Sequence, residues 1–160
     1  MNKKKRINKE YLFLFTTGAV CLAFMAFTIM LFPAVTITSG ENSYEVSGVF
    51  AIFGQVVTDE KLGELVFNFN PINLVGYLLP LVAVVLSVLA FKQEGLILNI
   101  ISAALCVIAS VTMFLEPVFF QVINPDYANY EVVISFGPIA AGILSLLSAV
   151  INISVFKIKK

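Results

Sequence analysis

The sequence predicts an all-α membrane protein, a four-transmembrane-helix bundle that carries a small extracellular cap of strands and loops. The first observation is composition, because 59% of the residues are hydrophobic and only 12% are charged, far from the usage of soluble domains. The second is a set of four uncharged apolar stretches at 12–32, 72–91, 96–115 and 136–156. Each holds about 20 residues, enough for roughly 30 Å of helix, the thickness of the hydrocarbon core of a bilayer. Lipid offers the backbone no hydrogen bonds, so such stretches must be helices. The chain length of 160 residues predicts one domain, 1–160.

Other classes of protein fit the sequence poorly. Buried helices of a soluble protein would show polar positions at a spacing of about 3.6 residues, and these stretches show none. Disorder requires low hydrophobicity and high charge, and nucleic-acid binding requires a clustered basic surface, whereas the net charge here is +0. The first stretch follows a basic segment, as in a signal peptide, but exceeds the roughly 7–15 apolar residues of one. We therefore expect it to be retained as a helix.

The connections between the helices differ in charge. The connections that include both termini carry nearly all the basic residues: Lys3, Lys4, Lys5, Arg6, Lys9, Lys92, Lys157, Lys159 and Lys160. The other connections, 33–70 and 116–135, hold Lys61 and most of the acids: Glu41, Glu45, Asp59, Glu60, Glu64, Glu116, Asp126 and Glu131. Because basic residues stay on the cytoplasmic side, we expect both termini inside and these two loops outside, in a multi-pass protein of the plasma membrane.

The first outer loop, 33–70, is too long to lack structure of its own. Residues 34–38 alternate and are rich in β-branched side chains, 39–42 have the composition of a turn, and 43–47 alternate again. This pattern predicts a β-hairpin.

The segment that follows, 48–53, is compatible with a strand or a short helix. Ser47 as N-cap and Gly54 after the last turn favour the helix. In the second outer loop a turn at 124–126 precedes a candidate strand, 130–136, which we expect to pair with the first loop.

Spacing of small residues predicts how the helices pack. The short turn at 92–95 makes the second and third helices antiparallel neighbours. Cys21 and Cys106 lie at the same depth in the first and third helices, which we expect to be neighbours or diagonal partners. Small side chains spaced by four residues predict packing faces: Ser102, Cys106 and Ser110 on the third helix, and Ala141, Ser145 and Ala149 on the fourth.

Few groups in the sequence could carry chemistry. There is no histidine, and Cys21 and Cys106 lie in apolar helices without a charged neighbour, where a thiol is inert. Zinc or copper would need further ligands, and no phosphate-binding or hydrolase motif is present. No ionisable residue lies between the ends of the predicted helices, where transport sites normally place one. We therefore expect no catalytic residue, no metal site and no cofactor, and a protein that is not an enzyme.

Four helices with a long first outer loop and a shorter second one resemble the claudin-like arrangement. The Gly-Leu-Trp motif and the loop disulfide of that family are missing, since the chain has no tryptophan and neither cysteine lies in an outer loop. This resemblance therefore covers topology alone. The stretch Pro33-Ala34-Val35, followed by residues 47–54, resembles small four-helix membrane proteins of low-GC Gram-positive bacteria, which are uncharacterised. That resemblance implies a fold and no activity.

The missing chemistry favours a non-enzymatic scaffold or accessory subunit, which contacts the lipid bilayer and interacts with another membrane protein or an envelope component through its outer loops and the surface of its bundle. Aromatic side chains anchor interfaces, so the candidate interaction residues are Tyr44, Phe50, Phe53, Phe67 and Phe69. The alternative is a component of a small transporter or channel. A deep pocket converging on Asn73, Ser87 and Asn99 would favour that alternative, and the sequence leaves the oligomeric state open.

Overall fold

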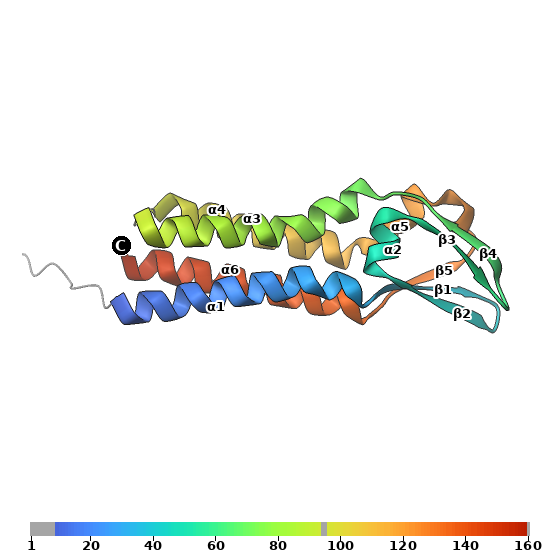
Figure 1. Ribbon diagram of the computed structural model, residues 1–160, viewed down its shortest axis with the longest axis horizontal. Helices are drawn as coiled ribbons and strands as arrows, with labels where there is room; N and C mark the ends of the chain where they lie inside the picture. The colour runs from blue at the N-terminus through green and yellow to red at the C-terminus, as the bar shows by residue number, and fades with distance from the viewer. Residues whose placement is uncertain (1–8, 94–95, 160) are drawn as a thin grey trace, which may run out of the picture.

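The computed structural model describes residues 9–93 and 96–159. Its long helices are α1 (Lys9–Thr28), α3 (Pro71–Gln93), α4 (Leu96–Phe114) and α6 (Phe136–Lys159). Figure 1 shows these helices side by side, with a smaller part made of strands and short helices beyond one of their ends. That part, residues 33–70 and 115–135, is the cap. The opposite end, where α1 begins and α6 ends, is called the terminal end.

The four long helices of the described residues are long and apolar enough to cross a membrane, as expected of a multi-pass membrane protein. The first differs from its predicted bounds of 12–32, since it begins at Lys9 and ends in a 3₁₀ turn, η1 (Ile29–Leu31). Pro33 opens a strand directly afterwards, so the helix tightens into a 3₁₀ turn before the chain leaves it.

Each long helix packs against two others. Helix α1 contacts α3 and α6, and α4 contacts the same two, so α1 and α4 are diagonal partners. Alanines fill much of the space between the helices, each no more than 4% exposed: Ala19, Ala23, Ala26, Ala83, Ala90, Ala103, Ala109, Ala141 and Ala149. Small side chains let helix backbones approach closely. A Cβ added to Gly76 of α3 would lie 2.5 Å from Oγ1 of Thr112 on α4. The turn predicted at 92–95 lies partly outside the described residues.

The cap contains the predicted hairpin and a third strand. Strands β1 (Pro33–Ser39), β2 (Asn42–Ser47) and β5 (Glu131–Ile134) form an antiparallel sheet in the order β2-β1-β5. Ile37 is opposite Tyr44 of β2 on one side and Val132 of β5 on the other. Gly40 takes a positive φ of 61° in the two-residue turn, which glycine adopts without strain. The sheet confirms both the hairpin and its pairing with the second loop.

A short helix, α2 (Gly48–Phe53), follows β2 and decides between the two predictions for this segment. The Phe50 N–H donates to Oγ of Ser47 at 3.4 Å, and Gly54 ends the helix at a φ of 74°. A Cβ on Gly48 would lie 2.5 Å from the carbonyl oxygen of Met30, so α2 is held tightly against the end of α1 and η1.

Two parts of the cap were expected to be loop and are regular. Strands β3 (Gln55–Asp59) and β4 (Gly63–Phe67) form a second hairpin. Its turn is held by Asp59, whose carboxylate accepts hydrogen bonds from the N–H groups of Leu62 and Lys61 at 2.9 Å, and these bonds lower its pKa. After α4 come helix α5 (Glu116–Ile123) and a 3₁₀ turn, η2 (Pro125–Tyr127). Pro117 lies in the first turn of α5, where its missing N–H costs nothing.

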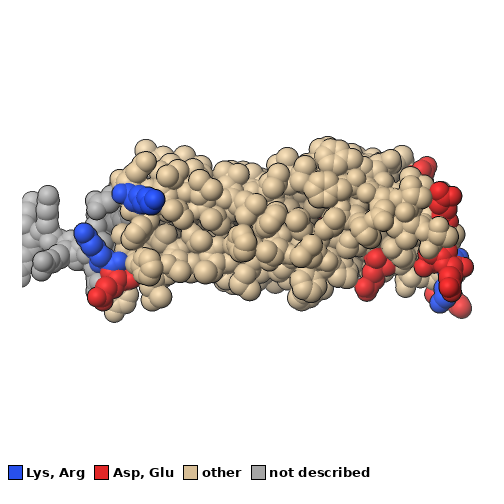
Figure 2. All heavy atoms as spheres, viewed as in Figure 1, with Lys and Arg blue, Asp and Glu red and all other residues tan. Residues whose placement is uncertain are grey.

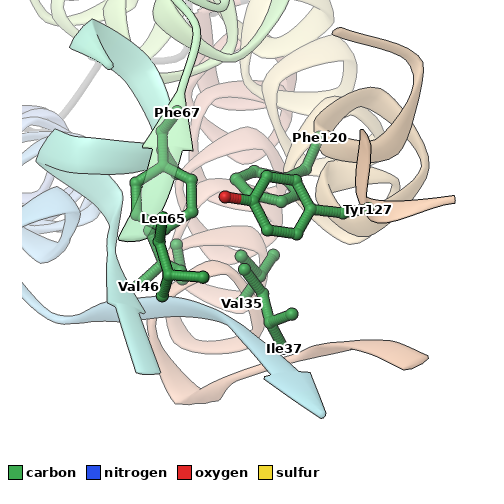
Figure 3. Close-up of a cluster of buried hydrophobic side chains, with 9 residues drawn as sticks. Val35, Ile37, Val46, Leu65, Phe67, Phe120 and Tyr127 are labelled. Carbon is green, nitrogen blue, oxygen red and sulfur yellow. The ribbon is translucent and has the colours of Figure 1, made fainter. Parts of the chain in front are cut away.

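The cap has a hydrophobic core of its own, shown in Figure 3. Side chains from both sheets and from α5 and η2 meet there: Val35, Ile37, Val46, Leu65, Phe67, Phe120 and Tyr127. The ring of Phe67 lies 5.8 Å from Phe120 and 5.6 Å from Tyr127, and it stacks on Tyr44 at 6.4 Å. The Tyr127 hydroxyl accepts a hydrogen bond from the Val66 N–H at 2.9 Å, which ties β4 to η2. These contacts make the cap a packed unit.

Candidate functional site

A buried polar cluster lies where the long helices meet the cap. Its members are Asn70, Asn73, Tyr77 and Glu116, none more than 2% exposed. The Asn73 amide donates to Oε1 of Glu116 at 3.2 Å, and the Tyr77 hydroxyl donates to Oε2 at 2.9 Å. Glu116 thus receives one hydrogen bond on each carboxyl oxygen. We call this set the junction cluster.

Local structure places each member of the junction cluster. Oδ1 of Asn70 accepts hydrogen bonds from the N–H groups of Ile72 and Asn73, both at 3.1 Å, and so caps the start of α3. Asn73 and Tyr77 are four residues apart and therefore lie on one face of α3. Glu116 is the first residue of α5, directly after the end of α4, and its side chain faces that face of α3.

The environment of Glu116 disfavours a negative charge. Its side chain is fully buried, and burial raises its pKa from 4.5 to about 8, against the opposing effect of the hydrogen bond from Tyr77. Two further polar atoms of the cluster, Nδ2 of Asn70 and Oδ1 of Asn73, are buried without a hydrogen-bond partner. Glu116 lies in the connection 116–135, as expected, but its burial was not predicted from the sequence. The reason is that Asn73 and Tyr77, which enclose it, come from a helix far away in the sequence.

A second buried polar cluster lies toward the terminal end of the helices. The Ser87 hydroxyl is 2.8 Å from that of Ser102 and 3.0 Å from Oδ1 of Asn152, which joins α3, α4 and α6. Asn99 is buried nearby in α4, and its Nδ2 has no partner. Asn73 and Ser87 are about 21 Å apart along α3, at 1.5 Å for each residue. The two ends of the helices therefore hold separate clusters, and Asn73, Ser87 and Asn99 do not converge on one pocket.

The residues predicted to pack helices lie inside the bundle of helices. All six are no more than 2% exposed: Ser102, Cys106, Ser110, Ala141, Ser145 and Ala149. Helices α4 and α6, which carry them, contact each other. The two cysteines differ, because Cys106 is buried and donates to Oγ of Ser148 at 3.7 Å, whereas Cys21 is exposed on α1.

The aromatic residues predicted as interaction anchors divide into two groups. Phe67 is only 4% exposed and belongs to the cap core, which corrects its expected exposure: Leu65 and Phe67 alternate to the inner face of β4. Tyr44 and Phe50 are partly buried and pack against the same core. Phe53 and Phe69 are 54% and 52% exposed, with ring centroids 6.5 Å apart.

Exposed apolar side chains continue from Phe53 and Phe69 along the β3–β4 hairpin. Val56 and Val66 are opposite each other in the ladder and are 57% and 45% exposed. They lie on the outer face of a hairpin whose inner face carries Leu65. We call Phe53, Val56, Val66 and Phe69 the cap strip.

Charges gather at the two ends of the molecule (Figure 2). The cap end carries exposed acids and the base Lys61: Glu41, Glu45, Glu60, Glu64, Asp126 and Glu131. Lys9 and Lys92 lie at the terminal end. The basic residues 3–6 and 160 lie outside the described residues.

No family model matches the chain, and no curated protein or solved structure shows significant similarity to it. The resemblances noted from the sequence therefore stay predictions.

Proposed function

We propose that this chain is a four-helix protein of the cell membrane that acts as a non-enzymatic scaffold or accessory subunit and binds a partner through its cap. Both termini then face the cytoplasm and the cap lies outside. The distribution of basic residues supports this orientation, because they gather at both chain ends and at Lys92, while the cap carries only Lys61.

The observation that carries the proposal is an exposed apolar strip on a cap with its own packed core. Large side chains such as Phe67 and Phe120 fix the β3–β4 hairpin against the rest of the cap. Phe53, the last residue of α2, and Phe69, two residues after β4, lie next to this packed hairpin in the chain and have ring centroids 6.5 Å apart. Exposed aromatic side chains on a rigid support make effective interface anchors, because little conformational entropy is lost when they bind.

The packing of the long helices supports an anchoring role for them. Ala23, Ala83, Ala109 and Ser145, from all four helices, are each no more than 1% exposed and fill the space between the helices. Close packing of small residues stabilises helix association in lipid.

The surroundings of the cap strip suggest the chemistry of the partner. Thr58 and Glu64 form the next exposed pair on the face that carries Val56 and Val66. An apolar pocket with a basic rim would be complementary to this face. Another membrane protein or an envelope component with such a pocket is the proposed partner.

Purification from native membranes in mild detergent tests the proposal. The wild-type protein should retain a stoichiometric partner, and the double variant Phe53→Ser, Phe69→Ser should lose it. Val133→Ser, on an equally exposed position of β5, is the matched control and should keep the partner. A photo-crosslinker at position 56 should react with the same partner. A partner that binds the double variant as well as the wild type would contradict docking through the cap.

A component of a small proton-coupled transporter is the second candidate, and Glu116 is the observation that favours it. Buried carboxyls next to membrane helices commonly belong to ion pathways. Reconstitution in liposomes separates the two functions. Proton flux that Glu116→Gln abolishes would support the transporter and contradict the scaffold, whereas an impermeable protein with a specific partner would support the scaffold.

A further inference from the structure

The junction cluster presents a carboxyl with two hydrogen-bond donors and no ion-pair partner among the described residues. We infer that Glu116, Asn73 and Tyr77 form a proton-binding site, in which the Glu116 carboxyl carries a proton at neutral pH and releases it as the pH rises. This inference concerns proton binding alone and holds whether the protein is a scaffold or part of a transporter.

Burial and the donor count favour the neutral carboxyl. A carboxylate that leaves water is tolerated when several hydrogen bonds or a cation replace the solvent. Glu116 is fully buried, and within the described part of the chain it accepts two hydrogen bonds, from Asn73 and Tyr77. The upward pKa shift caused by burial supports the same conclusion.

The amide of Asn73 fits both states of the carboxyl. With the carboxylate, its Nδ2 donates to Oε1, and its own Oδ1 is left buried without a partner. Rotation of the amide by half a turn places Oδ1 against Oε1, where it accepts a hydrogen bond from a protonated carboxyl. The Tyr77 hydroxyl donates to Oε2 in either state. The site therefore accommodates the arrival and departure of one proton without losing its two contacts.

Tyr77 is the titratable side chain that faces Glu116 from α3, and its hydrogen bond opposes the rise that burial causes in the pKa of Glu116. Helix α5 has no other acid or base, and α4 has only Cys106, which bonds to Ser148. In the cap, Glu41, Glu45, Glu60, Glu64, Asp126 and Glu131 are exposed, and Asp59 caps its own turn. Within the described residues no three His, Cys, Asp or Glu side chains gather to hold a metal ion. A single buried carboxyl is a site for one proton.

Infrared spectroscopy of the full-length protein in nanodiscs tests the inference. A protonated carboxyl has a C=O stretching band distinct from the bands of a carboxylate. Exposed glutamates are ionised well below pH 6.5, since their pKa is about 4.3. Between about pH 6.5 and about pH 9, below the tyrosine pKa of about 10, the band should fall in the wild type and be absent in Glu116→Gln. Glu64→Gln, an exposed control, should titrate as the wild type.

Two further measurements separate a proton site from a structural carboxyl or a cation site. Tyr77→Phe removes a donor to the carboxylate and should move the midpoint of the titration upward by roughly one pH unit. Replacing sodium by choline at constant ionic strength should leave the midpoint unchanged. The inference is overturned if Glu116→Gln removes no band at pH about 6.5, where an ordinary carboxyl is ionised, or if the midpoint depends on sodium, which would make the cluster a cation site.

Discussion

Replacement of Glu116 by glutamine should abolish a pH dependence of stability that the wild-type protein shows. The pKa of Glu116 is raised from 4.5 to about 8 in the folded protein, so between these values the folded state holds a proton that the unfolded state has released. The stabilising contribution is complete below pH 4.5, falls as the pH rises through this window and is lost above about pH 8.

The magnitude follows from the same two pKa values. Raising the pKa of a carboxyl from 4.5 to about 8 corresponds to roughly 5 kcal/mol, at about 1.36 kcal/mol for each pKa unit. Water that enters the site once the charge forms would reduce this figure, which makes it an upper bound. Glutamine stays neutral, keeps an acceptor for Tyr77 and can donate to Oδ1 of Asn73.

The free energy of unfolding, measured by steric trapping in bicelles at acidic and alkaline pH, checks the prediction. The wild type should lose up to about 5 kcal/mol between about pH 4.5 and pH 9, and Glu116→Gln should be unchanged. Glu64→Gln, at an exposed position of β4, should follow the wild type. The reasoning is refuted if the wild type is equally stable across this range while Glu116→Gln is weaker at every pH, because the carboxylate would then be the stabilised form.

Three other changes test the packing and the orientation. Ser145→Leu, at a fully buried position of α6, should cost on the order of 1–3 kcal/mol of unfolding free energy through overpacking, and an unchanged steric-trap result would contradict that packing. Gly76→Ala should also cost about 1–3 kcal/mol, because its Cβ would lie 2.5 Å from Thr112; a thermal midpoint equal to that of the wild type would show that the helices can separate without cost. In intact cells, cysteine at position 61 should react with an impermeant maleimide and cysteine at position 92 should not, and the reverse labelling would invert the proposed orientation.

The parts of the cap that sequence predicted are those determined by neighbouring residues. Strand β1 is rich in β-branched residues, β2 alternates with Tyr44 and Val46 on one face, and Gly40 lies in the turn between them. Helix α2 has Ser47 and Gly54 at its two ends. The β3–β4 hairpin was not predicted, although its sequence is also typical of a hairpin. Val56-Val57-Thr58 is a run of β-branched residues, and Gly63 is a turn glycine. Pro117 follows the predicted third helix and lies in the first turn of α5, a position typical of proline, yet this helix was not predicted.

The junction cluster could not be predicted in the same way, because its contacts are long-range. The residues next to Glu116 do not distinguish it from an exposed loop acid, because it directly follows an apolar stretch and precedes a proline. Its burial depends on Asn73 and Tyr77, which are 43 and 39 residues away in the chain. The helical spacing of Asn73 and Tyr77 was a usable signal for one polar face of α3, but nothing local indicated which residue lay opposite.

The cap is joined to the long helices in two physically different ways. The chain passes from α1 through η1 into β1, and from β5 into α6. Beside these two connections the Ser135 N–H donates to the Ala34 carbonyl oxygen at 2.9 Å. The backbones also approach closely there, since a Cβ on Gly137 would lie 2.6 Å from the Pro33 carbonyl oxygen.

Helices α3 and α4 meet the cap at the junction cluster, where Asn73 and Tyr77 of α3 bond to the carboxyl of Glu116 in α5. Backbone ladder bonds between strands do not change with pH, whereas hydrogen bonds to a titratable carboxyl do. Release of the Glu116 proton would therefore leave a buried negative charge at the contact between α3 and α5, held by the same two hydrogen bonds, and would not affect the strand connection to α1 and α6. The pH dependence of stability is therefore expected to arise at the contact between α3 and α5, and Glu116→Gln should remove it while the strand connection stays as it is.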